Sequence, residues 1–565
     1  MTRHRTGRQR RRCRAACLCL AAVFQLWLAG CAHEPAIETG GEPTLADLSS
    51  GAVTADTGTA TGDGQERAIT AYRDYLARYP DSPERNDIRL RLADLLVQTA
   101  GYTMVDLPAG AGAAQRYRSS AMQRYREDIA LYEQLLREQP DHPERAEIYY
   151  QLSKAYEETG QAEQATAVLD TLITQLPSAN IRLYSDALFR RAELQFDAGD
   201  YAAAEASYLQ VVGLGSTVAV YEQSLYKLGW SRFRQEKYEP ALDAFFTLLD
   251  EKLPPATDPV DQMDALAPAE QELLEDVFRA ISLSFSYLDG ADSINAWFAR
   301  SGPRHYEERI YRNLAGLYDS KELYTDAATT RLALAERVAG SATAPRLYIE
   351  VIGIYRQAGF RERLMQTHAT FVERYAPDSN FWRERTPAEL PEVSRQLESS
   401  LAELAQFHHA GYLEDGSADS YREAVHWYRS YLQLFPDADQ VIEIHLQLAE
   451  LLYARGDDAL AVPEYEYVAY EYGEHPRAAE SGLSAVQSCE RLRQQAAAGQ
   501  SGDRLQRCDA VAIRFVVNFP QHPDAATVLS RTGAGLLDRQ QAGEAGRVCR
   551  EILDRDDSVP GALRQ

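Results

Sequence analysis

Length, composition and charge exclude several classes of protein. The chain has 565 residues, of which 45% are hydrophobic and 25% charged, enough for several hydrophobic cores and too many for one compact domain. This balance excludes a fibrous or a wholly disordered chain. With 84 acidic against 59 basic side chains the formal charge is -25, and such a surface repels phosphate backbones, so we expect no nucleic-acid partner.

The first segment of the chain has the opposite charge. Residues 1–30 contain seven arginines and no acid, and an apolar run extends from Ala15 to Leu28. A positive region followed by a short apolar run is typical of a bacterial export signal, and this run is too short for a permanent transmembrane helix. We expect residues 1–30 to be removed as a signal peptide, which changes the formal charge of the exported chain from -25 to -32.

The end of this segment, Leu28-Ala29-Gly30-Cys31, resembles the lipobox of bacterial lipoproteins. The resemblance implies that Cys31 becomes the first residue and carries acyl chains such as palmitate. Ala32, rather than an aspartate, implies an outer-membrane lipoprotein facing the periplasm, in a host with two membranes. Apart from this covalent lipid we expect no cofactor. The alternative is that Cys31 is one more cysteine of a signal segment that already contains several (Cys13, Cys17, Cys19), but this leaves the preceding Leu-Ala-Gly unexplained.

Residues 31–64 form the second segment and consist mainly of Gly, Thr, Ala, Asp, Glu and Ser. Such a segment has too few large apolar side chains to offset the entropy lost when a chain becomes ordered. We therefore predict a lipidated, disordered tether that lets the folded part stand away from the membrane surface.

A short proline motif recurs after the tether and marks the ends of predicted helices. It consists of a proline, one or two polar residues and often a second proline, as at 79–83, 139–143, 435–437 and 519–523. An alanine stands twelve residues before each of Pro80, Pro177 and Pro436 (Ala68, Ala165, Ala424). A large residue stands eight residues before each of the same prolines (Tyr72, Leu169, Tyr428). This spacing predicts a helix that packs closely on a neighbour through its alanine and ends at the proline.

A second pattern predicts another helix before each of these. A large residue, a small residue and then another large residue recur at Leu152-Ser153, Arg191-Ala192, Leu228-Gly229, Leu314-Ala315 and Leu448-Ala449. Glycine or a polar residue marks the predicted turn between the two helices of a pair (Gly160, Gly199, Glu236, Glu322, Gly359, Gly456). The second helices then restart at alanines (Ala165, Ala204, Ala241, Ala327, Ala461). Helix pairs of this size stack into a solenoid in which no repeat is stable alone.

The two patterns together resemble the tetratricopeptide repeat family, whose unit pairs a Leu-Gly/Ala-Tyr helix with an Ala-aromatic-Ala-Pro helix. The strongest units are 146–179, 185–218, 222–253, 308–339 and 442–475. Weaker units are 65–80, 86–140, 273–300, 345–377, 395–436, 477–520 and 526–553. The resemblance implies an all-α helix-turn-helix solenoid with a right-handed superhelix. Spacings longer than the usual 34 residues or so leave the number of repeats open.

The solenoid is predicted to have two parts and a connecting loop. The repeats divide into an N-terminal part, 65–253, and a C-terminal part, 271–555, with a tail at 556–565. Between them lies an acidic, proline-rich loop at 254–270. Its aspartates (Asp258, Asp261, Asp264) lack the ligand spacing of a calcium loop, so we interpret it as a solvated loop.

The sequence contains none of the common catalytic patterns. A phosphate-binding Gly-rich loop, a Gly-x-Ser-x-Gly elbow and a His-Glu-x-x-His motif are all missing. His408 and His409 are adjacent on a predicted helix and point about 100° apart, so we interpret them as surface or packing residues rather than zinc ligands. We therefore predict that the protein is not an enzyme.

Three cysteines follow the predicted lipidation site, namely Cys489, Cys508 and Cys549. Export favours oxidation, and an odd number leaves at least one thiol unpaired or paired between chains. Cys489 and Cys508 stand at similar heights on the two arms of a predicted hairpin, so we hypothesise a disulfide between them. The alternative is that these cysteines act as small apolar packing residues.

Tyrosine is abundant, with 33 residues, and falls into two groups. The first group follows the repeat pattern and is predicted to lie in the core (Tyr72, Tyr132, Tyr156, Tyr208, Tyr318, Tyr355, Tyr428, Tyr465). The second group lies near the starts of first helices, which line the concave side of such superhelices (Tyr149, Tyr150, Tyr184, Tyr221, Tyr226, Tyr348). We predict partner contacts for this second group, with ordinary packing between repeats as the alternative.

The sequence thus predicts a lipid-anchored envelope scaffold that binds envelope proteins or peptides, with its acidic charge favouring partners with basic segments. Smaller lipoproteins with such repeats, including a barrel-assembly component and pilus pilotins, suggest by resemblance a role in assembling or coupling an envelope complex. Three alternatives stay open. The chain could be an accessory subunit of an export or energy-transducing machine, an activator of a cell-wall enzyme, or part of a longer parent chain, because the repeat pattern runs to about Leu553.

Overall fold

The computed structural model describes residues 60–105, 111–175, 180–255, 263, 265–495, 502–538, 543, 545, 546 and 550. Within these residues the chain forms 22 α-helices and one short 3-10 helix, with no β-strand. The predicted lipidation site at Cys31, the tether up to residue 59, and the aspartates of the predicted acidic loop lie outside the described residues.

The chain divides into two compact units, Met1–Ala165 and Thr166–Gln565. The helices that begin in the first unit are α2 (Ala60–Arg78), α3 (Arg85–Val105), α4 (Ala111–Glu138), α5 (Arg145–Glu158) and α6 (Ala162–Gln175). The boundary falls within α6, whereas the residues of the predicted loop at 254–270 belong to the second unit.

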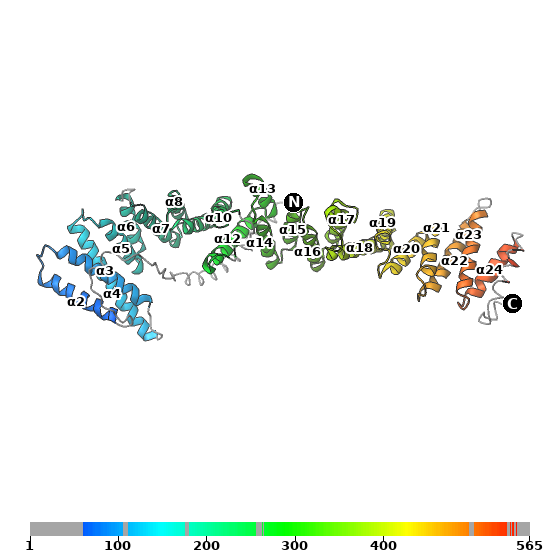
Figure 1. Ribbon diagram of the computed structural model, residues 1–565, viewed down its shortest axis with the longest axis horizontal. Coiled ribbons are helices and arrows are strands. Elements are labelled where there is room, and N and C mark those ends of the chain that lie inside the picture. The colour runs from blue at the N-terminus through cyan, green and yellow to red at the C-terminus, as the bar shows by residue number, and fades with distance from the viewer. Residues whose placement is uncertain are drawn as a thin grey trace, which may run out of the picture. The chain divides into compact units, whose positions relative to one another are not determined.

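The helices of the second unit follow one another in chain order (Figure 1). The first of them are α7 (Ile181–Asp197), α8 (Tyr201–Val212), α9 (Tyr221–Arg234), α10 (Tyr238–Lys252), α12 (Pro268–Tyr287), α13 (Ala291–Ser301), α14 (Glu307–Ser320) and α15 (Tyr324–Arg337). The others are α16 (Thr343–Ala358), α17 (Arg361–Tyr375), η1 (Asn380–Glu384), α18 (Pro391–Asp415), α19 (Ala418–Leu434), α20 (Val441–Arg455), α21 (Asp458–Tyr470), α22 (Ala478–Gln495), α23 (Gly502–Asn518) and α24 (Ala525–Asp538).

Successive helices form helix-turn-helix pairs, as the sequence patterns predict. We call the leading helices of the pairs first helices (α3, α5, α7, α9, α12, α14, α16, α18, α20, α22, α24). We call the helices that follow them second helices (α4, α6, α8, α10, α13, α15, α17, α19, α21, α23), and α2 is a second helix without a described partner before it. Each described pair overlaps one of the predicted repeat units, although most first helices begin one to five residues before it, and packing occurs mainly between helices that are neighbours in sequence.

The proline motifs end second helices at the predicted places. The helices α2, α4, α19 and α23 end at Arg78, Glu138, Leu434 and Asn518, each two residues before the motif's first proline. In the motif that follows α4, the backbone N–H of His142 donates to the carbonyl of Gln139 at 3.1 Å, and His522 makes the same 3.1 Å bond to Phe519. Proline ends the helix because it has no N–H to donate and restricts the residue before it.

The six predicted turns between paired helices all have left-handed backbone. The φ angle is positive at four glycines (Gly160, Gly199, Gly359, Gly456), where it lies between 72° and 88°. Two glutamates occupy the same turn position, Glu236 with φ of 61° and Glu322 with φ of 55°. Glycine is favoured in this conformation because it has no Cβ to meet the neighbouring carbonyl oxygen.

Small residues allow the helices of a pair to approach closely. The five alanines predicted to restart second helices are all fully buried (Ala165, Ala204, Ala241, Ala327, Ala461). In the first helix α9, Gly229 lies directly against the ring of Phe245 from α10, so that a Cβ added at Gly229 would lie only 2.7 Å from Cδ1 of that ring. The sequence pattern of large then small residues therefore corresponds to the contact between paired helices.

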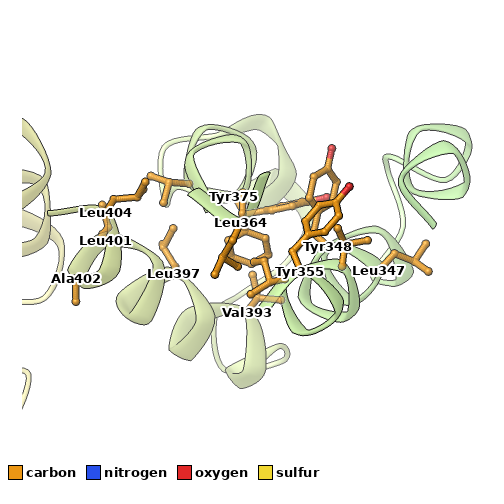
Figure 2. Close-up of a cluster of buried hydrophobic side chains, with 14 of the residues drawn as sticks. Leu347, Tyr348, Tyr355, Leu364, Tyr375, Val393, Leu397, Leu401, Ala402 and Leu404 are labelled. Carbon is orange, nitrogen blue, oxygen red and sulfur yellow. The ribbon is translucent and has the colours of Figure 1, made fainter. Parts of the chain in front are cut away.

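Aliphatic and aromatic side chains fill the spaces between consecutive pairs. Figure 2 shows part of this core, where Tyr348 and Tyr355 of α16 lie near Leu364 and Tyr375 of α17 and Val393 of α18. The rings of Tyr348 and Tyr375 are 5.8 Å apart in a T-shaped arrangement. These two rings pack within one pair, whereas Val393 belongs to the next pair and joins the same core. A core shared between pairs stabilises repeats that could not fold alone.

Buried tyrosines use acidic side chains as hydrogen-bond acceptors. The hydroxyl of Tyr132 on α4 donates to Asp94 on α3 at 2.7 Å, and that of Tyr431 on α19 donates to Glu398 on α18 at 2.8 Å. Tyr208 on α8 donates to Glu193 on α7 in the same way. Part of the acidic composition therefore serves to satisfy tyrosine hydroxyls at the edge of the core.

Candidate partner-binding surface

First helices of neighbouring pairs lie close together and carry a series of ion pairs. In the second unit, Lys227 of α9 lies 2.9 Å from Glu193 of α7. Further pairs connect α12 to α14, α14 to α16, α16 to α18, and α22 to α24 (Glu275–Arg309, Arg312–Glu350, Arg346–Glu392, Arg356–Glu403, Glu490–Arg531). Exposed pairs of this kind add little stability, but they neutralise the charges that take part.

The candidate tyrosines differ in how much surface they keep. Tyr149 and Tyr150 of α5 and Tyr184 of α7 are half-buried. Nζ of Lys154 lies 5.7 Å from the centre of the Tyr150 ring. These three side chains retain surface on first helices, so partner contact stays a prediction for them.

The other candidate tyrosines are more involved in packing. Tyr221 and Tyr226 of α9 are half-buried against the main core, and the Tyr226 hydroxyl donates to Asp276 of α12. Tyr348 is only 3% exposed, and its hydroxyl donates to Glu336 at 3.2 Å. This burial favours the alternative of ordinary packing for Tyr348, whose ring lies in the core between α16 and α17 (Figure 2), and partner contact at this residue stays an untested prediction.

Cys489 on α22 and Cys508 on α23 are both buried free thiols on neighbouring helices. Sγ of Cys508 lies 3.6 Å from the carbonyl oxygen of Cys489. The hairpin thus brings the two cysteines together as the sequence predicts, and the disulfide itself stays a prediction. Cys549 lies outside the described residues.

His408 and His409, predicted to be surface or packing residues, lie partly buried on α18. Nδ1 of His409 lies 2.9 Å from the hydroxyl of Tyr428, and burial lowers the pKa of both His408 and His409. Among the described residues, no group of three or more histidine, cysteine, aspartate or glutamate side chains could hold a metal ion. In the same part of the chain, no helix is long and apolar enough to cross a membrane.

One buried polar cluster was not predicted from the sequence. His368 of α17 is fully buried, with Nδ1 at 2.7 Å from Oγ of Ser400 and Nε2 at 3.4 Å from Glu403, both on α18. The His368 side chain and then the guanidinium of Arg356 lower the pKa of Glu403 to about 2. No sequence pattern distinguishes His368 from a surface histidine, because its partners lie on another helix.

An acid-lined cavity lies between α3 and α5 in the first unit and has a volume of about 420 Å³. One side is α3, with Asp94, and the facing side is α5, with Glu144 and Glu147. Tyr132 of the second helix α4 lines the cavity between them. Apolar and amide side chains complete the lining (Leu90, Val97, Gln98, Ile148, Gln151). The cavity is therefore part of the first-helix surface.

A buried carboxylate lies four residues before the cavity residue Tyr132 on α4 and is not itself part of the lining. Asp128 lies on α4 one helical turn before Tyr132 and is fully buried, and neither of its carboxylate oxygens has a hydrogen-bond partner in the described part of the chain. Burial, and then the negative charge of Asp94, raises the pKa of Asp128 well above its usual value. This region of the first unit therefore has more acidic groups than counter-charges.

Tetratricopeptide repeats are found in part of the chain by comparison with known families. One profile of the tetratricopeptide repeat family matches residues 121–185, and a second matches residues 186–213 and 223–251. These residues span most of the helices from α4 to α10. The same helix-turn-helix architecture continues through the remaining described helices, so the fold is an all-α, tetratricopeptide-like solenoid. No curated protein matches the chain.

Several solved structures of repeat proteins are similar to parts of the chain. The TPR-like repeats of a putative kinesin light chain from Podosopora anserina are 14% identical, cover 41% of this chain and 97% of their own, and give a TM-score of 0.26. The C-terminal part of a TPR repeat-containing protein from Cytophaga hutchinsonii is 13% identical over 58% of this chain and 98% of its own, with a TM-score of 0.24. A tetratricopeptide repeat protein from Parabacteroides merdae is 16% identical over 55% and 98%, also with a TM-score of 0.24.

Proposed function

We propose that this protein is a lipid-anchored scaffold of the bacterial envelope, which binds other proteins along its first helices and catalyses no reaction. The observation that carries the proposal is the first-helix surface, which recurs within each unit and in the first unit includes an acid-lined cavity. Repeat architectures of this kind present extended surfaces to their partners rather than a single closed site. The scaffold would serve the assembly or coupling of an envelope complex.

Charge gives the proposed scaffold a preference among partners. Without residues 1–30 the chain has a formal charge of -32. A field of this sign accelerates the approach of basic segments and disfavours acidic ones, so it affects association rate and specificity more than final affinity. Partners with a basic segment are therefore the class that this surface fits best.

The proposed location depends on the lipobox-like residues 28–31. Acyl chains on Cys31 would hold a water-soluble body at the membrane, since each buried CH₂ contributes about 0.8 kcal/mol and two or more chains give stable anchoring. Ala32 supports the outer membrane, with the repeats facing the periplasm.

Metabolic labelling with a palmitate analogue tests the anchor. The native chain is expected to take up label and to sediment with membranes, whereas Cys31→Ser is expected to do neither, because it lacks the thiol that would be acylated. Cys489→Ser, which changes a cysteine distant in sequence from the lipobox, is the matched control and should label like the native chain. A native chain without label would overturn the anchor.

In-cell crosslinking followed by identification of the captured proteins tests the scaffold. We expect a discrete set of envelope proteins with the native chain and a smaller yield with Cys31→Ser, because an unanchored chain is no longer concentrated at the membrane. Recovery of lipid or wall polymer without any protein partner would contradict the proposal.

A further inference from the structure

The cavity between α3 and α5 has an unbalanced charge. Its described lining includes three carboxylates (Asp94, Glu144, Glu147) and no basic side chain. Asp94 accepts a hydrogen bond from Tyr132, whereas Glu144 and Glu147 are exposed and their carboxylates form no ion pair with any described residue. The buried arginine of α3, Arg89, is already bound to Glu138 and Asn86. The protein itself therefore supplies no cation to this cavity from its described residues.

Asp128 is a further acidic group near Asp94, although it does not itself line the cavity. It is fully buried with both oxygens unpartnered in the described part of the chain, and it lies on the same face of α4 as Tyr132, which lines the cavity. Removing a carboxylate from water without a hydrogen-bond donor or counter-charge is costly. A cation held near Asp94 would reduce this cost, since Asp94 is close enough for its charge to act on Asp128.

The shape and lining of the cavity indicate which kind of cation fits. Leu90, Val97 and Ile148 provide apolar contact, while the carboxylates and the amides of Gln98 and Gln151 provide hydrogen-bond acceptors. Lysine and arginine have the matching construction, because an apolar stem carries a charged head. A volume of about 420 Å³ is within the usual range of about 300–1,000 Å³ for ligand pockets and can hold one such side chain.

We propose that the cavity between α3 and α5 binds a lysine or arginine side chain of a protein partner, an inference that rests on the proposed scaffold function. The stem of the bound side chain lies against Leu90 and Ile148, and its charged head is held by Asp94, Glu144 and Glu147. The cavity thus selects one basic residue in the partner, while the rest of the first-helix surface contacts the adjoining segment.

A peptide library tests this with the full chain. All peptides are degenerate except at one central position, which is fixed as arginine, lysine, citrulline, norleucine or glutamate. Citrulline retains the shape of arginine without its charge, so we expect the arginine and lysine pools to bind more tightly than the citrulline, norleucine and glutamate pools. Equal binding of the arginine and citrulline pools, or no binding of any pool, would overturn the proposal.

Two double variants test whether the preference for the arginine pool depends on the carboxylates of the cavity. Glu144→Gln with Glu147→Gln is expected to weaken binding of the arginine pool about tenfold, which corresponds to the loss of two partly exposed charge pairs. Glu163→Gln with Glu239→Gln makes the same change in net charge at two exposed helical glutamates outside the cavity and should bind like the native chain. Equal weakening in both double variants would show only a general field effect and would contradict the assignment.

Two further outcomes separate this inference from its alternatives. Binding of free spermidine that depends on Glu144 and Glu147, without preference among the peptide pools, would identify a polyamine site and overturn a protein side chain as the occupant. If the cavity variant still crosslinks the same envelope proteins in cells, while the pools show no charge preference, the cavity inference fails and the scaffold proposal stands. If the native chain captures no protein at all, the scaffold proposal itself fails.

Discussion

Asp128 is a buried acid of the first unit, and no described residue pairs with its carboxylate. Its cost to folding can be derived from its raised pKa. Below the pKa of about 3.9 for an unfolded aspartate, both states are protonated and the residue has no pH-dependent effect. Above that value the unfolded chain releases its proton while the folded chain retains it, so stability decreases until the pH reaches the folded pKa.

Replacement of this acid should therefore stabilise the protein at neutral pH. We expect Asp128→Asn to unfold at a higher denaturant concentration than the native chain at pH 7, with a difference in free energy of unfolding that increases with pH above the unfolded pKa until the folded pKa is reached. Urea unfolding at several pH values between 4 and 7 measures this. The exposed control Glu163→Gln should change little with pH, and a stabilisation by Asp128→Asn that is as large at pH 4 as at pH 7 would contradict the account.

Gly229 is the residue where close packing of paired helices is most constrained. An alanine there would bring its Cβ within 2.7 Å of the fully buried Phe245 ring, so we expect Gly229→Ala to lower the free energy of unfolding by about 1–3 kcal/mol. Gly316 on the first helix α14 has no atom within 4 Å of its added Cβ. Gly316→Ala should instead stabilise by up to about 1 kcal/mol through helix propensity, and thermal unfolding compares the two. Equal effects would mean that the contact with Phe245 is not close.

At the scale of the elements, the six predicted turns between paired helices share one backbone requirement, a residue with a positive φ angle. Four of the six predicted turns meet it with glycine, while Glu236 and Glu322 adopt a positive φ with a full side chain. Both glutamates are exposed, so neither packing nor burial demands that residue type. The left-handed conformation costs a residue with a Cβ about 1–2 kcal/mol, and a glycine costs about 0.5–1 kcal/mol in chain entropy.

The difference between these costs predicts a stabilising substitution. Glu236→Gly should raise the free energy of unfolding by about 0.5–1 kcal/mol, whereas Glu239→Gly, three residues later in the first turn of α10, should lower it by a similar amount because it weakens a helix. Chemical denaturation of both variants provides the measurement. If Glu236→Gly destabilises as much as Glu239→Gly, the positive φ at Glu236 is not a strained position.

The elements were predictable because their signals are local. Prolines, glycine turns and buried alanines such as Ala204 and Ala241 each act on neighbouring residues, and the helix pairs follow from them. The site was less predictable because it depends on which side chains meet across helices. Tyr348 has the position of a contact tyrosine but turns into the core, and the cavity joins Asp94 to Glu147 from helices that are not adjacent in sequence.

At the scale of the whole molecule, the repeated helix pairs present an extended surface of first helices within each unit. Most described helices pack mainly on their neighbours in sequence, so the properties of the chain are close to a sum over repeats and their interfaces. Binding that is spread over first helices should tolerate loss of one contact. We therefore propose that partners bind on the side of the repeats formed by the first helices. Crosslinking from chosen residues on first and second helices can test this.

Site-specific photo-crosslinking in cells tests that claim most directly. A photoreactive phenylalanine replaces Tyr149 of α5 or Tyr184 of α7 on first helices, and the matched control replaces Leu209 of the second helix α8, which is 42% exposed. We predict discrete adducts with envelope proteins from the two first-helix positions and none of these adducts from Leu209. The same adducts from Leu209, or no protein adduct from either first-helix position, would contradict a scaffold that binds along its first helices.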